Sequence, residues 1–376
     1  MNTLRSNTLR KHSFIHPVNS NYSSDIQKQR LEMAKAAYTT RRIDISVATK
    51  LLESDVTPRS GDVVLAKVVK LGHHKRIELE HGRRAPLFVG DEIIVCYGNR
   101  YAPDQFEAEV PGDLGSCHLV AAGGVASRCL SRHGNAKAPT VIQPLGLLSY
   151  SDGRVVNLAD FALPRATGRP PKPFVLAVVG TSMNAGKTTS AAHLIKGMVR
   201  SGMRVGAAKI TGTGAGGDRW MMKDAGAVEA VDFTDAGFVS TYRTPIKDVE
   251  DILDRLTAHL QNTGVDAIVL EIADGLFQGE TAELMRSQLF RKYVDGIVFA
   301  AGDSMGACAG VSWLQERNLP IVAVSGCVTA SPLAAREAQT ATGLPALGLD
   351  ELSSADITVS LFERCHDWMV RTSQVS

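Results

Sequence analysis

The segment 175–190, VLAVVGTSMNAGKTTS, constrains the fold of this chain more than any other. Its first five residues, Val175–Val179, are apolar and predict a buried parallel strand, and the apolar periodicity of 190–199 predicts a helix. A strand, a glycine-bounded loop and a helix in this order form the context in which G-K-T predicts a phosphate-binding loop. The alternative is an ordinary glycine turn with a solvated Lys187. The position of GKTT at the helix start favours the phosphate loop.

The loop residues suit the binding of a chain of phosphates. Backbone N–H groups of such a loop surround a phosphate, and the positive N-terminus of the next helix lies beneath it. Lys187 is placed to reach the outer phosphates, and the Thr188 hydroxyl is placed to bind Mg²⁺. The expected nucleotide-binding residues are Gly180, Thr181, Ser182, Met183, Asn184, Ala185, Gly186, Lys187, Thr188 and Thr189.

Charged residues follow two further predicted strands. Lys209 lies at the end of the strand predicted over 205–210, the edge at which open parallel sheets bind ligands. Glu271 follows the strand predicted over 266–270, where a carboxylate binds Mg²⁺ or metal-bound water. Asp274 lies three residues further on, and acts either as a general base or as the cap of a turn.

The loop pattern GT-x4-GKT, which begins at Gly180, resembles that of dethiobiotin synthetase and related ATP-dependent amide- and ring-forming enzymes. The resemblance covers about residues 174–350, and its other pieces are Lys209 with Thr213 and the segment VLEIADG around Glu271. It implies that Lys209, Thr213 and Gly214 contact substrate and phosphate, and that Glu271 binds magnesium.

The resemblance also implies a second acid near the metal. Asp218 and Asp224 both follow the glycine-rich segment TGTGAGG, and either suits this role; Asp218 lies nearer to the glycines. The expected metal ligands are therefore Thr188, Glu271 and Asp218. By analogy with the same family, the segment 327–330 is expected to contact adenine.

The order of these segments predicts an α/β fold with a doubly wound, mostly parallel sheet over 174–376. A smaller, all-β domain precedes it, since residues 60–111 read as short strands separated by Gly, Pro and Asp. Within residues 25–163 this domain follows a helical lead-in, and residues 118–134 are expected to lead into another helix. Residues 1–24 have the composition of a disordered tail, and 164–173 that of a linker.

One loop of the β-rich domain, GNRYAPDQFEAEVP, is dense in polar side chains. It contains Asn99, Arg100, Tyr101, Asp104 and Gln105. Binding residues favour loops, but a solvated turn anchored by Tyr101 is the interpretation that we prefer from the sequence.

Composition excludes several classes of protein. The net charge of +2 predicts no strong attraction to nucleic acid or to an anionic membrane surface. The six scattered cysteines contain no C-x-x-C pair, which argues for reduced thiols in a cytoplasm and against a zinc site. No apolar run has the length of a membrane span. We therefore expect a cytoplasmic protein with a small-molecule substrate, and by analogy with the family a homodimer.

Three functions fit these features. The first is an ATP- and Mg²⁺-dependent enzyme that activates a carboxylate or carbamate by phosphoryl transfer before an amine attacks, or a kinase of a small metabolite. Its catalytic residues would be Lys187, Lys209, Glu271 and Asp274. The second rests on a looser resemblance to the phosphate-loop family that includes D-glutamate N-acetyltransferases, in which the loop would hold the phosphates of acetyl-CoA. The third is a nucleotide-switched binding or chaperone module, similar to the metal-delivery GTPases.

Overall fold

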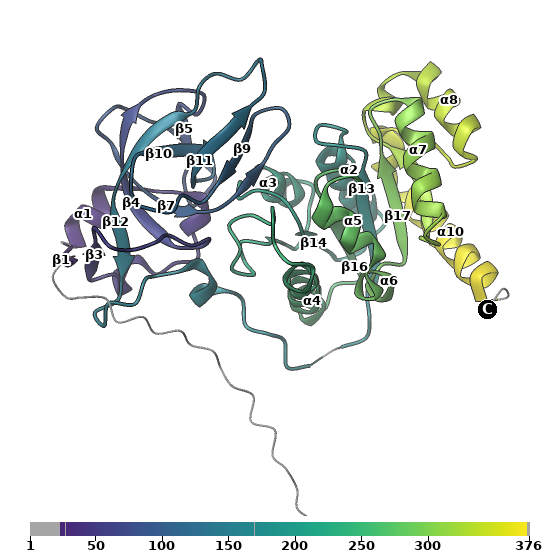
Figure 1. Cartoon of the computed structure of the whole chain (residues 1–376). Coiled ribbons are helices and arrows are strands. Elements are labelled where there is room, and N and C mark those ends of the chain that lie inside the picture. The colour runs from purple at the N-terminus through teal and green to yellow at the C-terminus, as the bar shows by residue number, and fades with distance from the viewer. Residues whose placement is uncertain (1–22, 27, 169, 374–376) are drawn as a thin grey trace, which may run out of the picture.

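The computed structural model describes residues 23–26, 28–168 and 170–373, and it contains a β-rich domain followed by an α/β domain (Figure 1). The tail expected over 1–24 lies mostly outside the described residues. Its last two residues, Ser23 and Ser24, are ordered in strand β1, so regular structure begins earlier than expected. Among the described residues, no helix combines the length and the apolar character needed to cross a lipid bilayer.

The β-rich domain is built from short strands. They are β1 (Ser23–Asp25), β2 (Lys35–Ala36), β3 (Lys50–Leu52), β4 (Val63–Lys70), β5 (Arg76–Glu78), β6 (Arg84–Pro86), β7 (Glu92–Tyr97), β8 (Arg100–Tyr101), β9 (Phe106–Glu109), β10 (Cys117–Ala121), β11 (Val125–Arg132) and β12 (Thr140–Ser149). Its helical pieces are α1 (Lys28–Met33) and the 3₁₀ turns η2 (Tyr38–Thr40), η3 (Ile45–Val47) and η4 (Leu158–Phe161).

The strands of this domain close into a small barrel. The pairing runs β12–β4–β7–β11, and β10 pairs with both β11 and β12, so the ring returns to its first strand. Alternating burial along β12 reflects the period of two with which strand side chains face the interior. The barrel extends to Ser149, well beyond the end near residue 111 that the sequence suggests.

Two expectations for this domain are wrong. The helical lead-in over 25–54 contains one short α-helix, α1, and the two 3₁₀ turns η2 and η3, while two short parts of it pair with strands that are distant in sequence: β2 with β7, and β3 with β12. Met33, the last residue of α1, is 79% exposed, so the apolar residues of this segment do not all face a core. No helix follows residues 118–134, which instead form the antiparallel pair β10 and β11.

The α/β domain contains a parallel sheet in the order β15–β14–β16–β13–β17–β18. Its strands are β13 (Phe174–Gly180), β14 (Val205–Lys209), β15 (Glu229–Asp232), β16 (Ala267–Glu271), β17 (Gly296–Ala300) and β18 (Ile321–Ser325). Its helices are α2 (Lys187–Arg200), α3 (Gly217–Asp224), α4 (Ile246–Asn262), α5 (Gly279–Arg286), α6 (Gln288–Tyr293), α7 (Ser304–Gln315), α8 (Pro332–Thr342), α9 (Leu349–Leu352) and α10 (Ala355–Ser373), with the 3₁₀ turn η5 (Cys327–Ala330).

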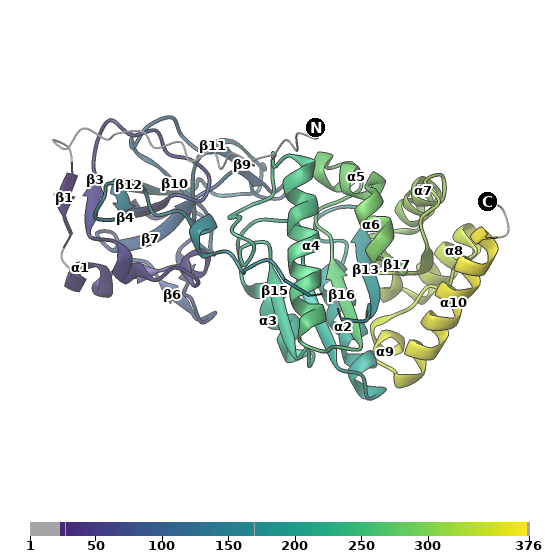
Figure 2. The same ribbon diagram turned by 90° about the horizontal axis from the view of Figure 1, so that it is seen from below.

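Helices cover both faces of this sheet, as Figure 2 shows from below. One apolar core joins the sheet to α2, α3, α9 and α10, and the other joins it to α4, α5, α6, α7 and α8. Strands β13 and β16 are apolar up to their carboxyl ends because both of their faces are buried. The doubly wound fold expected from the sequence is therefore the one observed.

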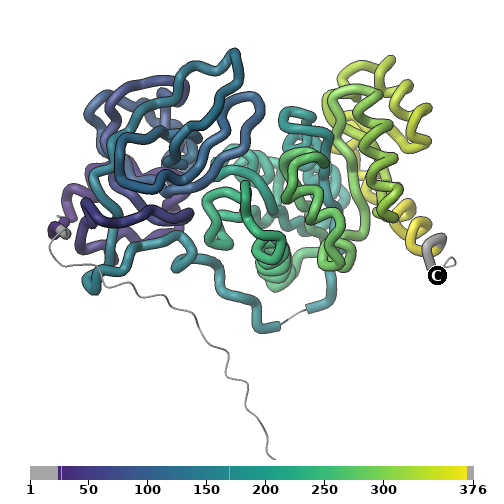
Figure 3. The backbone as a smooth tube through the Cα atoms, viewed as in Figure 1, coloured from purple at the N-terminus to yellow at the C-terminus, as the bar shows by residue number. Residues whose placement is uncertain are grey.

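The segment between the domains follows the surface of α4 (Figure 3). On α4, Arg255 donates a hydrogen bond to the carbonyl of Leu163 at 2.9 Å, and Gln261 donates to the carbonyl of Pro170. Residues 164–168 and 170–173 contain no helix or strand.

Buried charges hold the two domains together. The Tyr38 hydroxyl of the β-rich domain donates to Asp232 at the end of β15, at 2.5 Å. Arg41 forms ion pairs with Asp232 at 3.2 Å and with Asp235 at 2.6 Å, and all three side chains are at most 8% exposed. Glu78 accepts a hydrogen bond from the Gly216 amide at 2.9 Å. The polar segment 232–241 thus belongs to the domain interface.

Candidate nucleotide site

The register of the sheet brings the predicted site residues to one edge. Strand β16 lies between β13 and β14, with Glu271 paired with Val178 on one side and with Lys209 on the other. The carboxyl ends of these parallel strands meet at the edge where the loop 181–186 begins. Residues more than 80 positions apart in the sequence therefore become neighbours.

The shape of the loop depends on glycine at both ends. A Cβ on Gly180 would lie 2.7 Å from the Ala300 carbonyl oxygen and 2.8 Å from Lys187 Cγ, so the lysine stem passes directly over this residue. Gly186 has φ of +94°, and a Cβ there would lie 2.9 Å from Gly326 Cα. Asn184 also has positive φ, at 65°.

The start of α2 is free to receive an anion. No side chain among the described residues caps its first turn, whose N–H groups have no intrahelical acceptors. Lys187 is 5% exposed, and its Nζ donates to the Ser182 carbonyl at 2.7 Å. Burial lowers the pKa of Lys187, whereas the charges of Glu271 and Asp274 act in the opposite direction. The geometry is that of a phosphate loop with its lysine folded onto the loop backbone.

Thr188 and Glu271 form the candidate metal site. The Thr188 hydroxyl donates to Glu271 Oε1 at 2.8 Å. Glu271 is 1% exposed, and its second oxygen, Oε2, has no hydrogen-bond partner among the described residues. Burial raises the pKa of Glu271, and Lys209 opposes this effect. A buried carboxylate oxygen without a partner fits a hard cation, which takes oxygen ligands.

No group of three His, Cys, Asp or Glu residues suited to a metal occurs in the part of the chain that the structure describes. A magnesium ion at Thr188 and Glu271 would therefore take its remaining ligands from phosphate oxygens and water. Mg²⁺ commonly binds in this way, through one or two carboxylates and the phosphates of its substrate.

Lys209 lies beside the same carboxylate. Its Nζ forms an ion pair with Asp218 and a longer one, at 3.4 Å, with Glu271 Oε1. Burial acts to lower the pKa of Lys209, but Asp218 and Glu271 together raise it, so the side chain is a cation. Asp218 is thus the acid adjacent to Lys209, whereas Asp224 lies exposed at the far end of α3.

Three further residues predicted for the site are Thr213, Gly214 and Asp274. Thr213 forms a bridge with Ser240, and the Gly214 amide donates to the Val239 carbonyl at 2.8 Å. Both residues therefore pair with the backbone of 239–240. Asp274 lies within electrostatic range of Lys209 and Lys187, and burial raises its pKa.

The β-rich domain reaches the phosphate loop, which the sequence interpretation missed. Asp104 Oδ2 accepts a hydrogen bond from Asn184 Nδ2 at 3.0 Å. Arg100, in the same polar loop, is 6% exposed and interacts electrostatically with Asp274. The preference for a solvated turn anchored by Tyr101 is wrong, because this loop lies against the candidate site. The density of polar side chains in this loop was the sequence signal that could have indicated its contact with the site.

A cavity of about 720 Å³ adjoins the phosphate loop at Gly186 and Thr189. The lining comes from the loop and α2, from the segment after β18, and from the start of α9. Its residues are Gly186, Thr189, Gly326, Cys327, Thr329, Ala330, Gly348, Leu349, Asp350 and Glu351. The segment 327–330, expected to contact a base, thus lines a cavity next to the site expected for phosphates.

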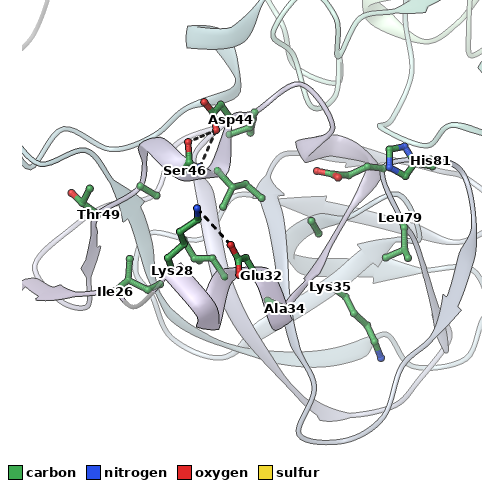
Figure 4. A pocket seen from close by; sticks show the side chains of 16 residues that line it. Ile26, Lys28, Glu32, Ala34, Lys35, Asp44, Ser46, Thr49, Leu79 and His81 are labelled. Carbon is green, nitrogen blue, oxygen red and sulfur yellow. Dashed lines mark hydrogen bonds and ion pairs between the residues drawn. The ribbon is translucent and has the colours of Figure 1, made fainter.

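A second cavity, of about 730 Å³, lies in the β-rich domain. It is lined by residues of 26–49 and 79–81, and none of them belongs to the α/β domain. Figure 4 shows Lys28 paired with Glu32 on α1, and Ser46 bonded to Asp44, among its lining side chains. This cavity is separate from the phosphate loop.

In comparisons with known proteins, the model of one family matches part of the α/β domain. The model of the family MobB, molybdopterin guanine dinucleotide synthesis protein B, matches residues 175–291. The match contains the phosphate loop, Lys209 and Glu271, and excludes the β-rich domain and the segment after β18. The search of curated proteins found no match.

Similar solved structures include three proteins of protein targeting and cell division. The signal recognition particle 54 kDa protein of Aeropyrum pernix, in complex with GDP, is 22% identical, with a TM-score of 0.34, over 52% of this chain and 50% of that one. The cell division protein FtsY of Thermotoga maritima is 17% identical, with a TM-score of 0.32, over 50% and 66%. The signal recognition particle receptor FtsY of Elizabethkingia anophelis is 16% identical, with a TM-score of 0.30, over 42% and 50%. The chain thus spans about half to two thirds of their lengths.

The loop geometry, the parallel sheet and the match to MobB over residues 175–291 together show that the chain contains a P-loop nucleotide-binding domain of the NTPase superfamily.

Proposed function

We propose that this protein is a Mg²⁺-dependent enzyme that transfers a phosphoryl group from a nucleoside triphosphate to a small metabolite. The observation that carries the proposal is the Thr188–Glu271 pair, with one carboxylate oxygen buried and unpartnered. Glu271 forms an ion pair with Lys209 through Oε1 only, so its buried second oxygen has no partner among the described residues unless a cation binds there, and leaving it unpaired is costly.

Each charged residue has a defined task in this reaction. Lys187 leaves the Ser182 carbonyl to bind the outer phosphates, and with Lys209 it offsets negative charge on the phosphoryl group in transfer. Mg²⁺, held by Thr188 and Glu271, would supply further neutralisation of phosphate charge. Asp274, whose pKa burial raises, accepts the proton of a hydroxyl acceptor; where the acceptor is a carboxylate, which carries no proton, Asp274 accepts the proton that the amine loses when it attacks the acyl phosphate.

The acceptor that best fits the resemblance to dethiobiotin synthetase is a carboxylate or carbamate, with ATP as the donor. Formation of an acyl phosphate would then allow an amine to attack and an amide to form. An acetyl-CoA-dependent N-acyltransferase remains the alternative, and it gives no role to the Thr188–Glu271 pair. We also propose the homodimer expected from the resemblance, which light scattering after size-exclusion chromatography tests.

The decisive experiment compares ligand binding by calorimetry in the wild type, Lys187→Ala and Lys196→Ala. Lys196 lies on the same helix and serves as the matched control. We expect binding of ATP or GTP with Mg²⁺ to weaken about tenfold or more in Lys187→Ala, since charge-assisted hydrogen bonds are lost, and to be unchanged in the control. Binding of acetyl-CoA alone would refute the proposal.

A GTP-dependent binding module is the second candidate, and two observations favour guanine. MobB is described as a molybdopterin guanine dinucleotide synthesis protein, and Asp350 is one of the residues that line the cavity beside the loop. Guanine presents two kinds of N–H donor, at N1 and N2, to a carboxylate. If this candidate is correct, Asp350→Asn should lower the affinity for GTP about tenfold or more while the affinity for ATP stays the same. An unchanged ratio of the two affinities would exclude this role of Asp350.

A further inference from the structure

Arg100 is a buried cation whose neighbours leave its charge unpaired. Its side chain is held by neutral groups: Nη2 donates to Gln105 Oε1 at 2.8 Å, and Nη1 lies 3.2 Å from His74 Nε2. The third nitrogen, Nε, is buried and has no hydrogen-bond partner within the described residues. No carboxylate of those residues lies within 4.0 Å of the guanidinium as an ion pair. Burial of a charge without an ion-pair partner costs free energy, and buried guanidinium groups are normally paired with acids.

The loop that carries Arg100 is attached firmly to the α/β domain. Asp104 binds Asn184 of the phosphate loop at 3.0 Å, and the rings of Tyr101 and Tyr242 lie 5.5 Å apart. The Tyr242 hydroxyl also donates to Glu107 on β9 at 3.2 Å. Arg100 is therefore held at a fixed position relative to the phosphate loop, although it belongs to the other domain.

The electrostatic environment joins Arg100 to the candidate site. Burial lowers the pKa of Arg100 to about 10, and the two acids that oppose this effect most are Asp104 and Asp274. Asp274 in turn interacts electrostatically with Lys209 and Lys187 of the α/β domain and with Arg100 of the β-rich domain. Together with Lys187 and Lys209, Arg100 is thus a third positive charge within electrostatic range of Asp274.

We propose that Arg100 binds an anionic group of a ligand beside Asp274, so that the β-rich domain contributes directly to the nucleotide site. The anion has two possible sources: the terminal phosphate of the nucleotide, or a carboxylate on the acceptor metabolite. Both present oxygen atoms to which a guanidinium donates in a forked geometry. This inference rests on the proposed function, since it requires a nucleotide at the phosphate loop.

The first arm of the test measures nucleotide binding by calorimetry in the wild type, Arg100→Gln and Arg76→Gln. Arg76 is exposed on β5 and serves as the control. The probes are the Mg²⁺ complexes of a non-hydrolysable triphosphate and of the diphosphate with the same base. If Arg100 contacts the terminal phosphate, Arg100→Gln loses about tenfold or more in affinity for the triphosphate and little for the diphosphate.

The second arm repeats the measurement with the triphosphate analogue bound and adds succinate, glutarate or acetate as the probe. If Arg100 holds the acceptor, one of these carboxylates raises the melting temperature of the wild type and of Arg76→Gln, but not that of Arg100→Gln. The proposal is overturned if Arg100→Gln matches the wild type in both arms. It is also overturned if Arg100→Gln keeps the wild-type affinity for the triphosphate and no carboxylate raises the melting temperature of the wild type.

Two measurements keep the outcome clear. If Arg100→Gln does not fold, Arg100→Lys replaces it, because an ammonium keeps the charge and loses the forked contact. Binding of the diphosphate is measured in every variant. A wild type that binds no nucleotide refutes the proposed function, whereas intact diphosphate binding with no effect of Arg100 refutes this inference alone.

Discussion

The substitution Glu271→Gln tests the role of the buried carboxylate most directly. An amide oxygen still accepts the hydrogen bond of Thr188, so the shape of the site is kept. Two effects on stability oppose each other. The change relieves the burial of a charge with an unpartnered oxygen, but it removes one of the two acids paired with Lys209, which keeps Asp218. We therefore expect the free energy of unfolding without ligand to change by less than about 2 kcal/mol.

The effect on ligand binding should be larger. In the wild type, a Mg²⁺–triphosphate complex at about 100 times its Kd stabilises the protein by about 2.7 kcal/mol. Loss of a charged ligand to the metal costs about 1.5–3 kcal/mol, which weakens binding about 10- to 150-fold. At the same ligand concentration the stabilisation then falls to about 1.4 kcal/mol or less. For a domain of this size, a melting-temperature shift of about 5–10 °C becomes one of about 3–6 °C or less.

Thermal denaturation of the wild type, Glu271→Gln and Glu283→Gln, with and without Mg²⁺, measures this difference. Glu283 is exposed on α5 and controls for the loss of one negative charge. With EDTA present, all three proteins should respond to the nucleotide alike. The reasoning fails if Glu271→Gln keeps the full Mg²⁺-dependent shift, because the unpartnered oxygen would then have no part in metal binding.

Three further changes test other parts of the structure. Because burial raises the pKa of Asp274, the acid limb of the pH–rate profile should lie above the pH usual for an aspartate, and activity should rise as the carboxylate deprotonates. Asp274→Asn should abolish that limb. A limb that is unchanged in the variant would exclude Asp274 as the base. Arg41→Ala leaves buried carboxylates unpaired and should lower the free energy of unfolding by about 3–5 kcal/mol in denaturant titrations. The control Arg42→Ala, whose side chain is 30% exposed, should cost about 1 kcal/mol or less, and equal losses would contradict this account. Gly326→Ala places a Cβ 2.3 Å from the Ala185 carbonyl oxygen, at a residue with φ of +92°. The variant should therefore have a lower affinity for nucleotide in calorimetry. The control Gly302→Ala, whose Cβ would meet no atom within 4 Å, should keep the wild-type affinity.

The sequence predicts the α/β domain well because its signals are local. An apolar run followed by Glu271 or Lys209 marks a buried strand and its carboxyl end at once. Helix α8 carries its own boundaries, since Ser331 caps its start and Gly343 ends it in the left-handed conformation. In a parallel sheet the carboxyl ends of the strands lie at one edge. The fold class alone therefore predicts that residues at these ends are close together in space.

The β-rich domain and the domain interface depend on pairings that no local pattern contains. Residues 35–52 have helix-like apolar spacing, but β2 and β3 form because β7 and β12 offer them unpaired edges. Asp232 and Asp235 look like ordinary loop acids until Arg41, nearly 200 residues away, is placed between them. Polar contacts of this kind are set by the docking of whole domains, which one sequence does not reveal.

Two unpartnered atoms in the structure support the assignment of the site independently of any resemblance. Glu271 Oε2 lies at the end of β16 and Arg100 Nε on the neighbouring domain, and both are buried without a hydrogen bond within the described residues. Leaving such a group unpaired costs about 1–3 kcal/mol, and more when it is charged. A fold selected for stability alone would pair these charges or replace them with apolar side chains. A carboxylate with one unpartnered oxygen near the start of α2 is suited to a further cation, and a guanidinium with one unpartnered nitrogen is suited to an anion. A metal–phosphate complex with its acceptor presents both charges, so one bound ligand set would satisfy the two atoms together.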